Sequence, residues 1–421
     1  MKRKIKKDIQ FYKFCLYGFL KNLKFFDAFI ILFFREMGFS FLKIGLLFSI
    51  REIATNILEM PTGVVADSYG RRKSMILAFS SYIISFLIFY FFPSFSLYVV
   101  AMIFFALGEA FRSGTHKAMI LEYLKIKNMT DIKVFYYGNT RACSQFGSAI
   151  SSIIAAFLVF LSGDYKIIFI ATIIPYILAL ILMITYPKEL DGEIRKYTSS
   201  SHIKNFIKNS IATIKEFFNI FKNPLTVKVI FNTSIFEAFF KSTKDYLQPI
   251  VKTYVLSIPF LLYLNQDKRV SILIGIVYFT LYIFTSLASK NSGYFVNMTK
   301  SLTSAVNITF LIEVLIIFLA GLFFYLKIYI LVIIIFILNY ILFNIRKPIM
   351  VSYVSDLISS RIMATGLSLE SQVKTILIAI LSPFIGFLVD KTGIGNTLII
   401  LSLILLVLYF IIKIKKTSKI S

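Results

Sequence analysis

Cysteine and histidine are rare in this sequence, and a nucleotide-binding loop is missing from it. Only two cysteines, Cys15 and Cys143, occur in 421 residues, and the two histidines lie far apart in the chain. Neither residue type has the spacing of a disulfide framework, a metal site or a catalytic cluster. No G-x-x-x-x-G-K-[ST] phosphate loop occurs, so nothing indicates a motor driven by ATP. We therefore expect no enzymatic activity, no cofactor and no bound metal.

Charged residues are also scarce, and acidic ones especially so. Charged side chains make up 16% of the chain and hydrophobic ones 58%, whereas soluble proteins are about 45 to 50% apolar. This composition predicts a polytopic membrane protein. The formal charge of +25 would suggest a nucleic-acid partner in a soluble domain, but here Lys and Arg stand in short segments between apolar runs. We expect them to orient a monomeric protein and to contact lipid head groups, with no nucleic acid bound.

Apolar runs long enough to cross a bilayer, which takes about 20 residues each, occur about twelve times. They cover residues 11–34, 41–66, 74–92, 96–121, 138–162, 165–186, 225–255, 269–288, 301–325, 329–355, 364–389 and 396–412. The even count puts both termini on one side, together with the basic N-terminus, the segment around Arg71 and the Lys-rich tail. Because cytoplasmic loops are rich in Lys and Arg, we predict a multi-pass protein of the cytoplasmic membrane with both termini in the cytoplasm. The first run is longer than a signal-peptide core, so we expect it to be retained.

Between the sixth and seventh runs the composition turns polar. Ile203, Phe206, Ile207 and Ile211 recur there at helical spacing, with lysines between them. This pattern predicts an amphipathic helix lying on the cytoplasmic leaflet, and a calmodulin-type target sequence is the alternative interpretation. We therefore divide the chain into an N-terminal bundle at 1–187, an amphipathic linker at 188–224 and a C-terminal bundle at 225–421.

A charged segment, predicted to be a short loop, joins the second and third runs. It reads Gly63-Val64-Val65-Ala66-Asp67-Ser68-Tyr69-Gly70-Arg71-Arg72-Lys73. A basic cytoplasmic turn explains Arg71 to Lys73 but not the spaced Gly63, Asp67 and Gly70. The pattern G-x-x-x-D-x-x-G-R-R-K resembles the loop between helices 2 and 3 of the major facilitator superfamily. The resemblance implies an all-α membrane protein of twelve transmembrane helices in two pseudo-symmetric six-helix bundles.

The same resemblance implies a role for this segment. It would act as a conformational latch that holds the start of helix 11, around Thr365 and Gly366, in one state of the transport cycle. The latch residues are Gly63, Asp67, Gly70, Arg71, Arg72, Lys73 and Arg141. A second stretch, Arg346-Lys347-Pro348-Ile349, is similar to helix 10 of bacterial facilitators of unassigned substrate. The fifth run has no Gly-Pro pair, and so departs from the pattern of drug:proton antiporters.

Ionisable residues inside the apolar runs are the candidates for function. Each costs about 2.5 to 3.5 kcal/mol at the bilayer centre, so the set needs partners or a wet cavity. Most of them fall on the helices that, by the resemblance, line or flank a central cavity, and Glu313 in the ninth run is the exception. The candidates for contact with substrate or proton are Asp27, Glu52, Glu109, Arg112, Glu237, Lys241, Lys244 and Asn344. The alternative is that they form structural ion pairs at helical spacing, such as Lys24 with Asp27 or Lys241 with Glu237.

These observations predict a secondary active transporter. It would move a small charged, zwitterionic or amphipathic solute by alternating access, coupled to protons and resembling an efflux system. Glu109 and Glu237, on cavity helices of opposite halves, best suit the exchange of protons. An uptake permease, or a membrane sensor or scaffold that kept the fold without transporting, is the alternative function.

Overall fold

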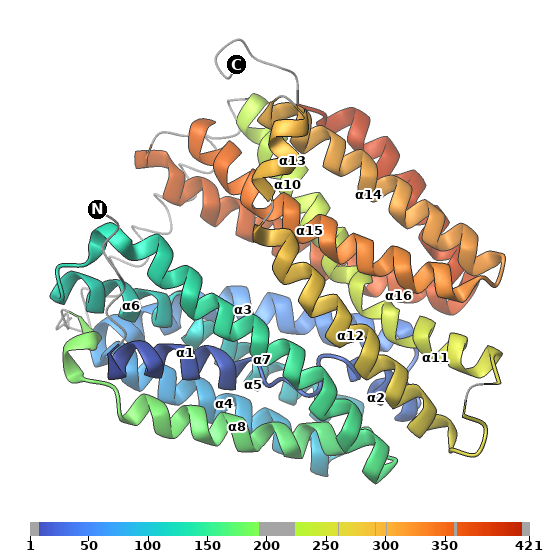
Figure 1. Cartoon of the computed structure of the whole chain (residues 1–421), viewed down its shortest axis with the longest axis horizontal. Coiled ribbons are helices and arrows are strands. Elements are labelled where there is room, and N and C mark those ends of the chain that lie inside the picture. The colour runs from blue at the N-terminus through green and yellow to red at the C-terminus, as the bar shows by residue number, and fades with distance from the viewer. Residues whose placement is uncertain are drawn as a thin grey trace. The chain divides into compact units, whose positions relative to one another are not determined.

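The computed structural model describes residues 8–192, 224–259, 261–290, 292–299, 301–357 and 360–414, with a few side chains in these ranges excepted. The described residues form helices joined by turns and short connections (Figure 1). The chain divides into two compact units. The first comprises Met1–Gly38, Ile50–Tyr197 and Pro259–Ile283, and the second Phe39–Ser49, Thr198–Ile258 and Phe284–Ser421. The sequence boundaries at 187 and 224 stay a prediction, and the amphipathic helix expected at 203–221 lies outside the described residues.

The first unit is built on α4 and α7. Its helices are α1 (Ile9–Lys21), α2 (Ile30–Glu36), most of α3 (Phe41–Tyr69), α4 (Arg71–Phe91), α5 (Phe95–Arg112), α6 (Thr115–Ile126), α7 (Lys133–Ser162), α8 (Ile167–Ile184) and most of α12 (Gln266–Lys290), with 3-10 turns η1 (Thr130–Ile132) and η2 (Lys188–Asp191). Helix α4 packs against α5 and α8, and α1 packs against α7. Their interior is aromatic: the ring centroid of Phe169 lies 6.4 Å from that of Phe86 and 4.8 Å from that of Phe89, within the range where aromatic pairs attract.

The second unit is built around α16. Its helices are α10 (Pro224–Thr243), α11 (Leu247–Ser257), α13 (Ser292–Thr299), α14 (Leu302–Tyr325), α15 (Tyr329–Leu357) and α16 (Ser360–Ile412), with the 3-10 turn η3 (Lys244–Tyr246) between α10 and α11. Helices α10 and α14 pack on α16, and α14 also packs on α15. Helix α16 departs from helical geometry at Gly393, which corresponds to the expected division between the last two runs.

Each unit also holds a helix segment from the other half of the sequence. The start of α3 is fixed in the second unit, where the backbone N–H groups of Phe41 and Leu42 donate to the carboxylate of Asp390 at 2.9 and 2.8 Å. Two N–H groups on one carboxylate satisfy orphan donors at a helix start. Most of α12 belongs to the first unit, where Tyr165 donates to Asp267 at 2.9 Å.

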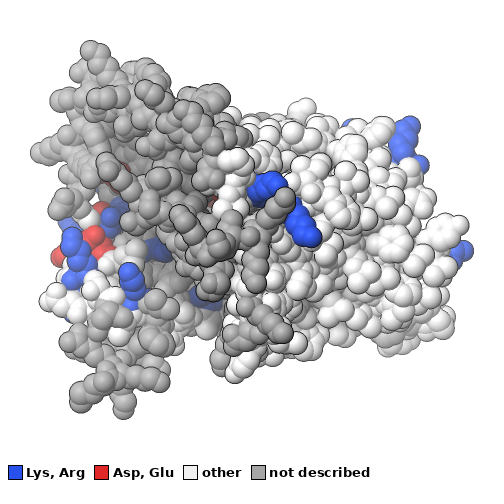
Figure 2. All heavy atoms as spheres, turned by 90° about the horizontal axis from the view of Figure 1, so that it is seen from above, with Lys and Arg blue, Asp and Glu red and all other residues white. Residues whose placement is uncertain are grey.

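Several helices are long and apolar enough to cross a membrane. In the described ranges these are 71–91, 95–126, 136–162, 167–184, 266–288, 302–325, 329–350 and 370–412. On α8, Ile174, Leu178 and Ile181 share an exposed face whereas Tyr176 and Ala179 are buried, as expected of a helix with one face toward lipid. Figure 2 shows broad uncharged surface between small groups of Lys and Arg.

The structure corrects four of the predicted elements. The expected helix at 11–34 is broken between Lys21 and Ile30, and the one at 225–255 is divided by η3. The expected helix at 96–121 is interrupted at Gly114, which has the left-handed φ of 71°. The predicted loop at 63–73 is mostly helical, because Gly63 and Asp67 continue α3 as far as Tyr69. Only Gly70 turns the chain there.

Gly70 is required by its conformation and by its neighbour. Its φ of 96° and ψ of 147° lie close to a region that essentially only glycine occupies. A Cβ at this position would lie 2.9 Å from the carboxyl carbon of Asp191, which is hydrogen-bonded to Arg72. The turn between α3 and α4 therefore admits no side chain.

We predict that Gly70→Ala lowers the melting temperature of the protein by several degrees, because the strained backbone costs about 1 to 3 kcal/mol. Gly63→Ala is the matched control: its Cβ would meet open space, and alanine stabilises a helix interior by about 0.5 to 1 kcal/mol. Thermal unfolding followed by circular dichroism in detergent measures both. Equal melting temperatures for the two variants would contradict this account of the turn.

Candidate functional site

The break in the first helix is a fixed feature of the first unit. Helix α1 ends at Lys21 and α2 begins at Ile30. The Asn22 side-chain amide donates to the carbonyl of Ser144 on α7 at 2.8 Å. The Tyr176 hydroxyl of α8 donates to the carbonyl of Lys21 at 3.3 Å. Non-helical backbone at membrane depth persists only where protein or a wet cavity satisfies its polar groups, and here neighbouring helices do so.

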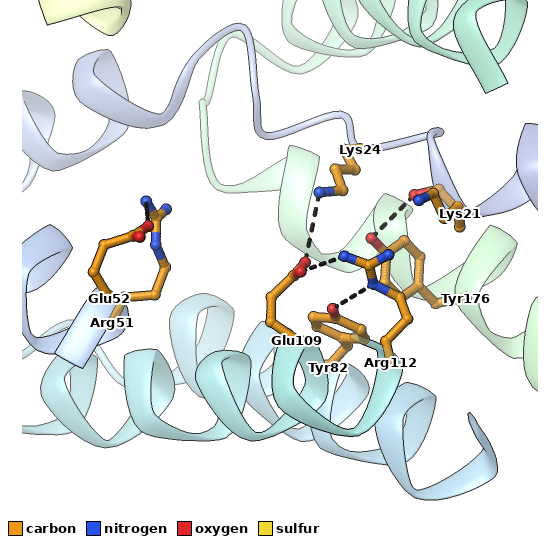
Figure 3. Close-up of polar contacts among 8 residues, drawn as sticks. All are labelled: Lys21, Lys24, Arg51, Glu52, Tyr82, Glu109, Arg112 and Tyr176. Atoms are coloured by element: carbon orange, nitrogen blue, oxygen red, sulfur yellow. Dashed lines mark hydrogen bonds and ion pairs between the residues drawn. The ribbon is translucent and has the colours of Figure 1, made fainter. Parts of the chain in front are cut away.

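Glu109 and Arg112 of α5 meet Lys24 of the break. Arg112 and Glu109 form an ion pair one helical turn apart, and the Lys24 ammonium lies 3.8 Å from a Glu109 oxygen. The Arg112 Nε donates to the Tyr82 hydroxyl of α4 at 3.1 Å. Figure 3 shows Lys24 projecting from the break toward Glu109. Because these ionic side chains are 22 to 23% exposed, the cluster is not sealed from a solute.

A hollow of about 260 Å³ lies beside this cluster within the first unit. Its polar lining includes Lys21, Asn22, His116, Thr140, Arg141 and Gln145. The charges of Arg112, Lys24 and Glu109 also act on Lys21. The ion pairs therefore contribute to the electrostatic potential in the hollow. Its cations outnumber its acidic groups, which favours a bound group of negative charge.

His116 is held inside the first unit by two tyrosines. Its ring stacks on that of Tyr17 with centroids 3.6 Å apart, and one ring nitrogen lies 3.3 Å from the Tyr186 hydroxyl. Both contacts fix the imidazole at the wall of the hollow. Sequence position alone could not show this, because Tyr17 and Tyr186 come from distant segments.

The remaining first-unit candidates lie apart from the hollow or at its edge. Glu52 forms an ion pair with the adjacent Arg51 at 3.0 Å, separate from the Glu109 cluster in Figure 3. Asp27 lies in the break and acts electrostatically on Tyr176. The structure therefore brings Glu109 and Arg112 together, and adds Lys21 and Lys24, which the sequence selection left out.

The candidates in the second unit are held by ion pairs and backbone contacts. Glu237 of α10 pairs with Lys374 of α16 at 3.3 Å. Lys244 pairs with Asp245 at 2.6 Å within the 3-10 turn that divides the seventh helix. Asn344 donates to the carbonyl of Tyr340 in its own helix at 2.9 Å, while Lys241 lies in the last turn of α10.

Two of the predicted latch residues form described ion pairs, and both of these pairs lie within the first unit. Arg71 pairs with Glu122 at 3.4 Å, and Arg72 pairs with Asp191 at 3.1 Å. Asp67 and Lys73 are exposed, and Arg141 borders the hollow. The side chains of Thr365 and Gly366 are outside the described set, so the latch stays a prediction.

The model of the Major Facilitator Superfamily matches residues 15–373. The chain belongs to this superfamily. The predicted all-α membrane fold is confirmed.

Individual relatives are distant. The chain is 28% identical over 222 residues to the uncharacterized MFS-type transporter YxaM of Bacillus subtilis (strain 168), a match that covers 52% of this chain and 53% of YxaM. The chain thus spans about half the length of the curated relative it matches.

Solved structures share the fold over nearly the whole chain. A point mutant of the nucleoside transporter NupG superposes with a TM-score of 0.75 at 15% identity, covering 96% of this chain and 98% of NupG. A POT family transporter in complex with a thioalcohol-conjugated peptide has a TM-score of 0.70 at 17% identity, covering 96% and 93%. The xylose transporter XylE from E. coli has a TM-score of 0.62 at 16% identity, covering 97% and 95%. At such identities the likeness shows the fold.

We predict that Tyr82→Phe destabilises the protein, because it leaves the partly buried Arg112 Nε without its acceptor. A fully buried unmet donor costs about 1 to 3 kcal/mol, which sets the upper limit of the loss. Tyr136→Phe is the matched control, since the buried Tyr136 hydroxyl has no hydrogen-bond partner among the described residues. Melting temperatures of both variants in detergent provide the measurement. A larger loss for Tyr136→Phe than for Tyr82→Phe would refute the assignment.

Proposed function

We propose that this chain is a proton-coupled secondary transporter of a small solute that carries a negative charge, either an anion or a zwitterion. It works by alternating access in the cytoplasmic membrane, with both termini in the cytoplasm. Transporters of this kind often bind substrate where a transmembrane helix is discontinuous. The first helix of this chain is broken at Lys21 to Ile30.

The observation that carries the proposal is the cationic hollow at that break. Lys21 and Arg141 line it, and Lys24 and Arg112 act on Lys21 from next to it. Glu109 offsets part of this charge through its two ion pairs. The remaining positive charge is best compensated by a solute carboxylate or phosphate, which forms charge-assisted hydrogen bonds with Lys and Arg.

The charge of the hollow narrows the class of solute more than the fold does. Structures of similar fold belong to a nucleoside transporter, a POT family transporter with a peptide conjugate and a xylose transporter. Because one fold hosts many substrates, only the site can discriminate among them. A neutral sugar would leave the cations of the hollow uncompensated. A volume near 260 Å³ lies just below the range of about 300 to 1,000 Å³ typical of ligand pockets, which suits a small solute.

A transporter also accounts for the hollow better than a scaffold does. A protein that kept the fold only as a scaffold gains nothing from ionic side chains that stay about one fifth exposed. Their cost inside a membrane is offset when they bind and release a solute.

We predict that small carboxylates, phosphates or amino acids protect the purified protein against heat, whereas neutral sugars of similar size do not. Ligand binding to the folded state raises stability by about 2.7 kcal/mol at a hundred times the dissociation constant. A thermal-shift screen identifies the class, and counterflow of the radiolabelled hit in proteoliposomes tests transport.

Two variants locate the binding site in this assay. Lys21→Met should abolish the protection and the counterflow, because it removes the amino group from the wall of the hollow. Lys125→Gln, at an exposed position of α6, should leave both unchanged. Protection by sugars alone, or protection that survives in Lys21→Met, would overturn the proposed solute class.

A further inference from the structure

Glu313 of α14 is an isolated acid in the second unit. Its side chain is fully buried, at 0% exposure. Neither carboxylate oxygen has a hydrogen-bond partner among the described residues. A buried carboxylate without hydrogen bonds is among the most costly groups a protein can contain. Its presence therefore calls for a chemical reason.

Arg346 of α15 is the charged side chain that acts on Glu313. Arg346 is 2% exposed, and its guanidinium donates to the Thr309 hydroxyl and the Val306 carbonyl of α14 and to the Asn232 amide oxygen of α10. Arg346 therefore links α10, α14 and α15.

The aromatic surroundings of Arg346 reinforce this link. The guanidinium carbon lies 4.2 Å from the centroid of the Phe236 ring of α10 and 5.7 Å from that of Phe310, within the range of cation–π attraction. The Nε of Arg346 has no hydrogen-bond partner among the described residues. The Nε–H group of Arg346 is therefore a donor without a described acceptor, and the Glu313 carboxylate on which Arg346 acts has oxygens without a described donor.

The other elements packed on α14 bring no acid or base into direct contact with Glu313 in the described part of the chain. Helix α16 contributes Tyr409 against Phe310, with the Lys413 ammonium 5.9 Å from the Tyr409 ring. Helix α10 contributes Asn232 and Phe236, and its Glu237 acts on Arg346. The segment of α13 contains no charged residue.

The other acids near buried cations are bound differently. Glu109 has ion pairs with Arg112 and Lys24, and Glu237 has one with Lys374. A proton arriving at either acid must displace a cation. At Glu313 it displaces no such partner and removes the buried negative charge. Protonation of Glu313, the acid that the sequence placed outside the cavity pattern, therefore requires no described ion pair to break.

We propose that Glu313 is the residue that binds and releases the coupling proton, and that Arg346 transmits its charge to α10. The proposal rests on the proposed function for its role in transport. The step is a proton transfer alone: an O–H bond forms on the carboxylate oxygen, and the proton leaves from the same oxygen later. With the proton bound, Arg346 keeps its bonds to Asn232 and Thr309. With the proton released, the carboxylate attracts the guanidinium and weakens its hydrogen bond to Asn232 of α10.

Infrared difference spectroscopy of the purified full chain between acidic and alkaline pH tests proton binding without any substrate. The band of a protonated carboxylic acid should disappear in Glu313→Gln and persist in Glu109→Gln. Glu313→Asp, which keeps the carboxyl group, should retain a shifted band. Glutamine has nearly the shape of the protonated acid, so the first variant is expected to fold. An unchanged band in Glu313→Gln would overturn the assignment.

Transport gives the second readout, with the anionic solute found in the thermal-shift screen as the probe. In proteoliposomes, Glu313→Gln should keep solute counterflow, which needs no net proton movement, and lose accumulation driven by a pH gradient. Glu313→Asp should restore part of that accumulation. Accumulation at the wild-type level in Glu313→Gln would refute the proposal. If the wild-type protein transports nothing, the proposed function fails, while the infrared result still decides whether Glu313 binds a proton.

Discussion

The cost of placing ions in lipid determines how each described unit is held together. Apolar side chains gain little from leaving lipid for one another, so helices in a bilayer associate through close packing and polar contacts. In the first unit Lys24 of the helix break meets Glu109 of α5, and in the second Glu237 of α10 meets Lys374 of α16. Each pair joins segments that are distant in the sequence. These ion pairs therefore also help to hold the helices in register.

The breaks in the helices follow from the same constraint. The first helix of each half of the chain is interrupted, at Lys21 to Ile30 and at Lys244 to Tyr246. An interruption frees backbone carbonyls and N–H groups, which membrane proteins tolerate only beside other polar groups. At the first break Asn22 and Tyr176 supply the contacts, and at the second the Tyr340 hydroxyl reaches the Lys244 carbonyl at 3.5 Å. Broken backbone and buried ions therefore occur together.

Hydropathy predicted most of the fold because lipid imposes a length and a composition on every span. It did not predict the break after Lys21, since Leu23, Phe25 and Phe26 keep the window apolar although Asn22, Lys24 and Asp27 stand among them. It also assigned Gly63 and Asp67 to a loop, because both residues are common in turns, although only Gly70 needs a positive φ. In the candidate site, Glu109 and Arg112 were predictable as a pair one turn apart. Lys24 joins them through tertiary packing, which helical spacing does not encode.

Glu313 illustrates how a departure from a sequence pattern can be informative. It was the one buried acid that did not fit the helices expected to line a cavity, and a pattern based on helix position gave it no role. Its surroundings differ in kind from those of Glu109 and Glu237, whose charges are already compensated by cations. A solute site benefits from such preformed ion pairs, because a charged solute can exchange partners with them. A proton site benefits from their absence, because there the proton itself is the compensating charge. The proposal therefore assigns the recognition of solute charge to the first unit and the uptake of the proton to the second.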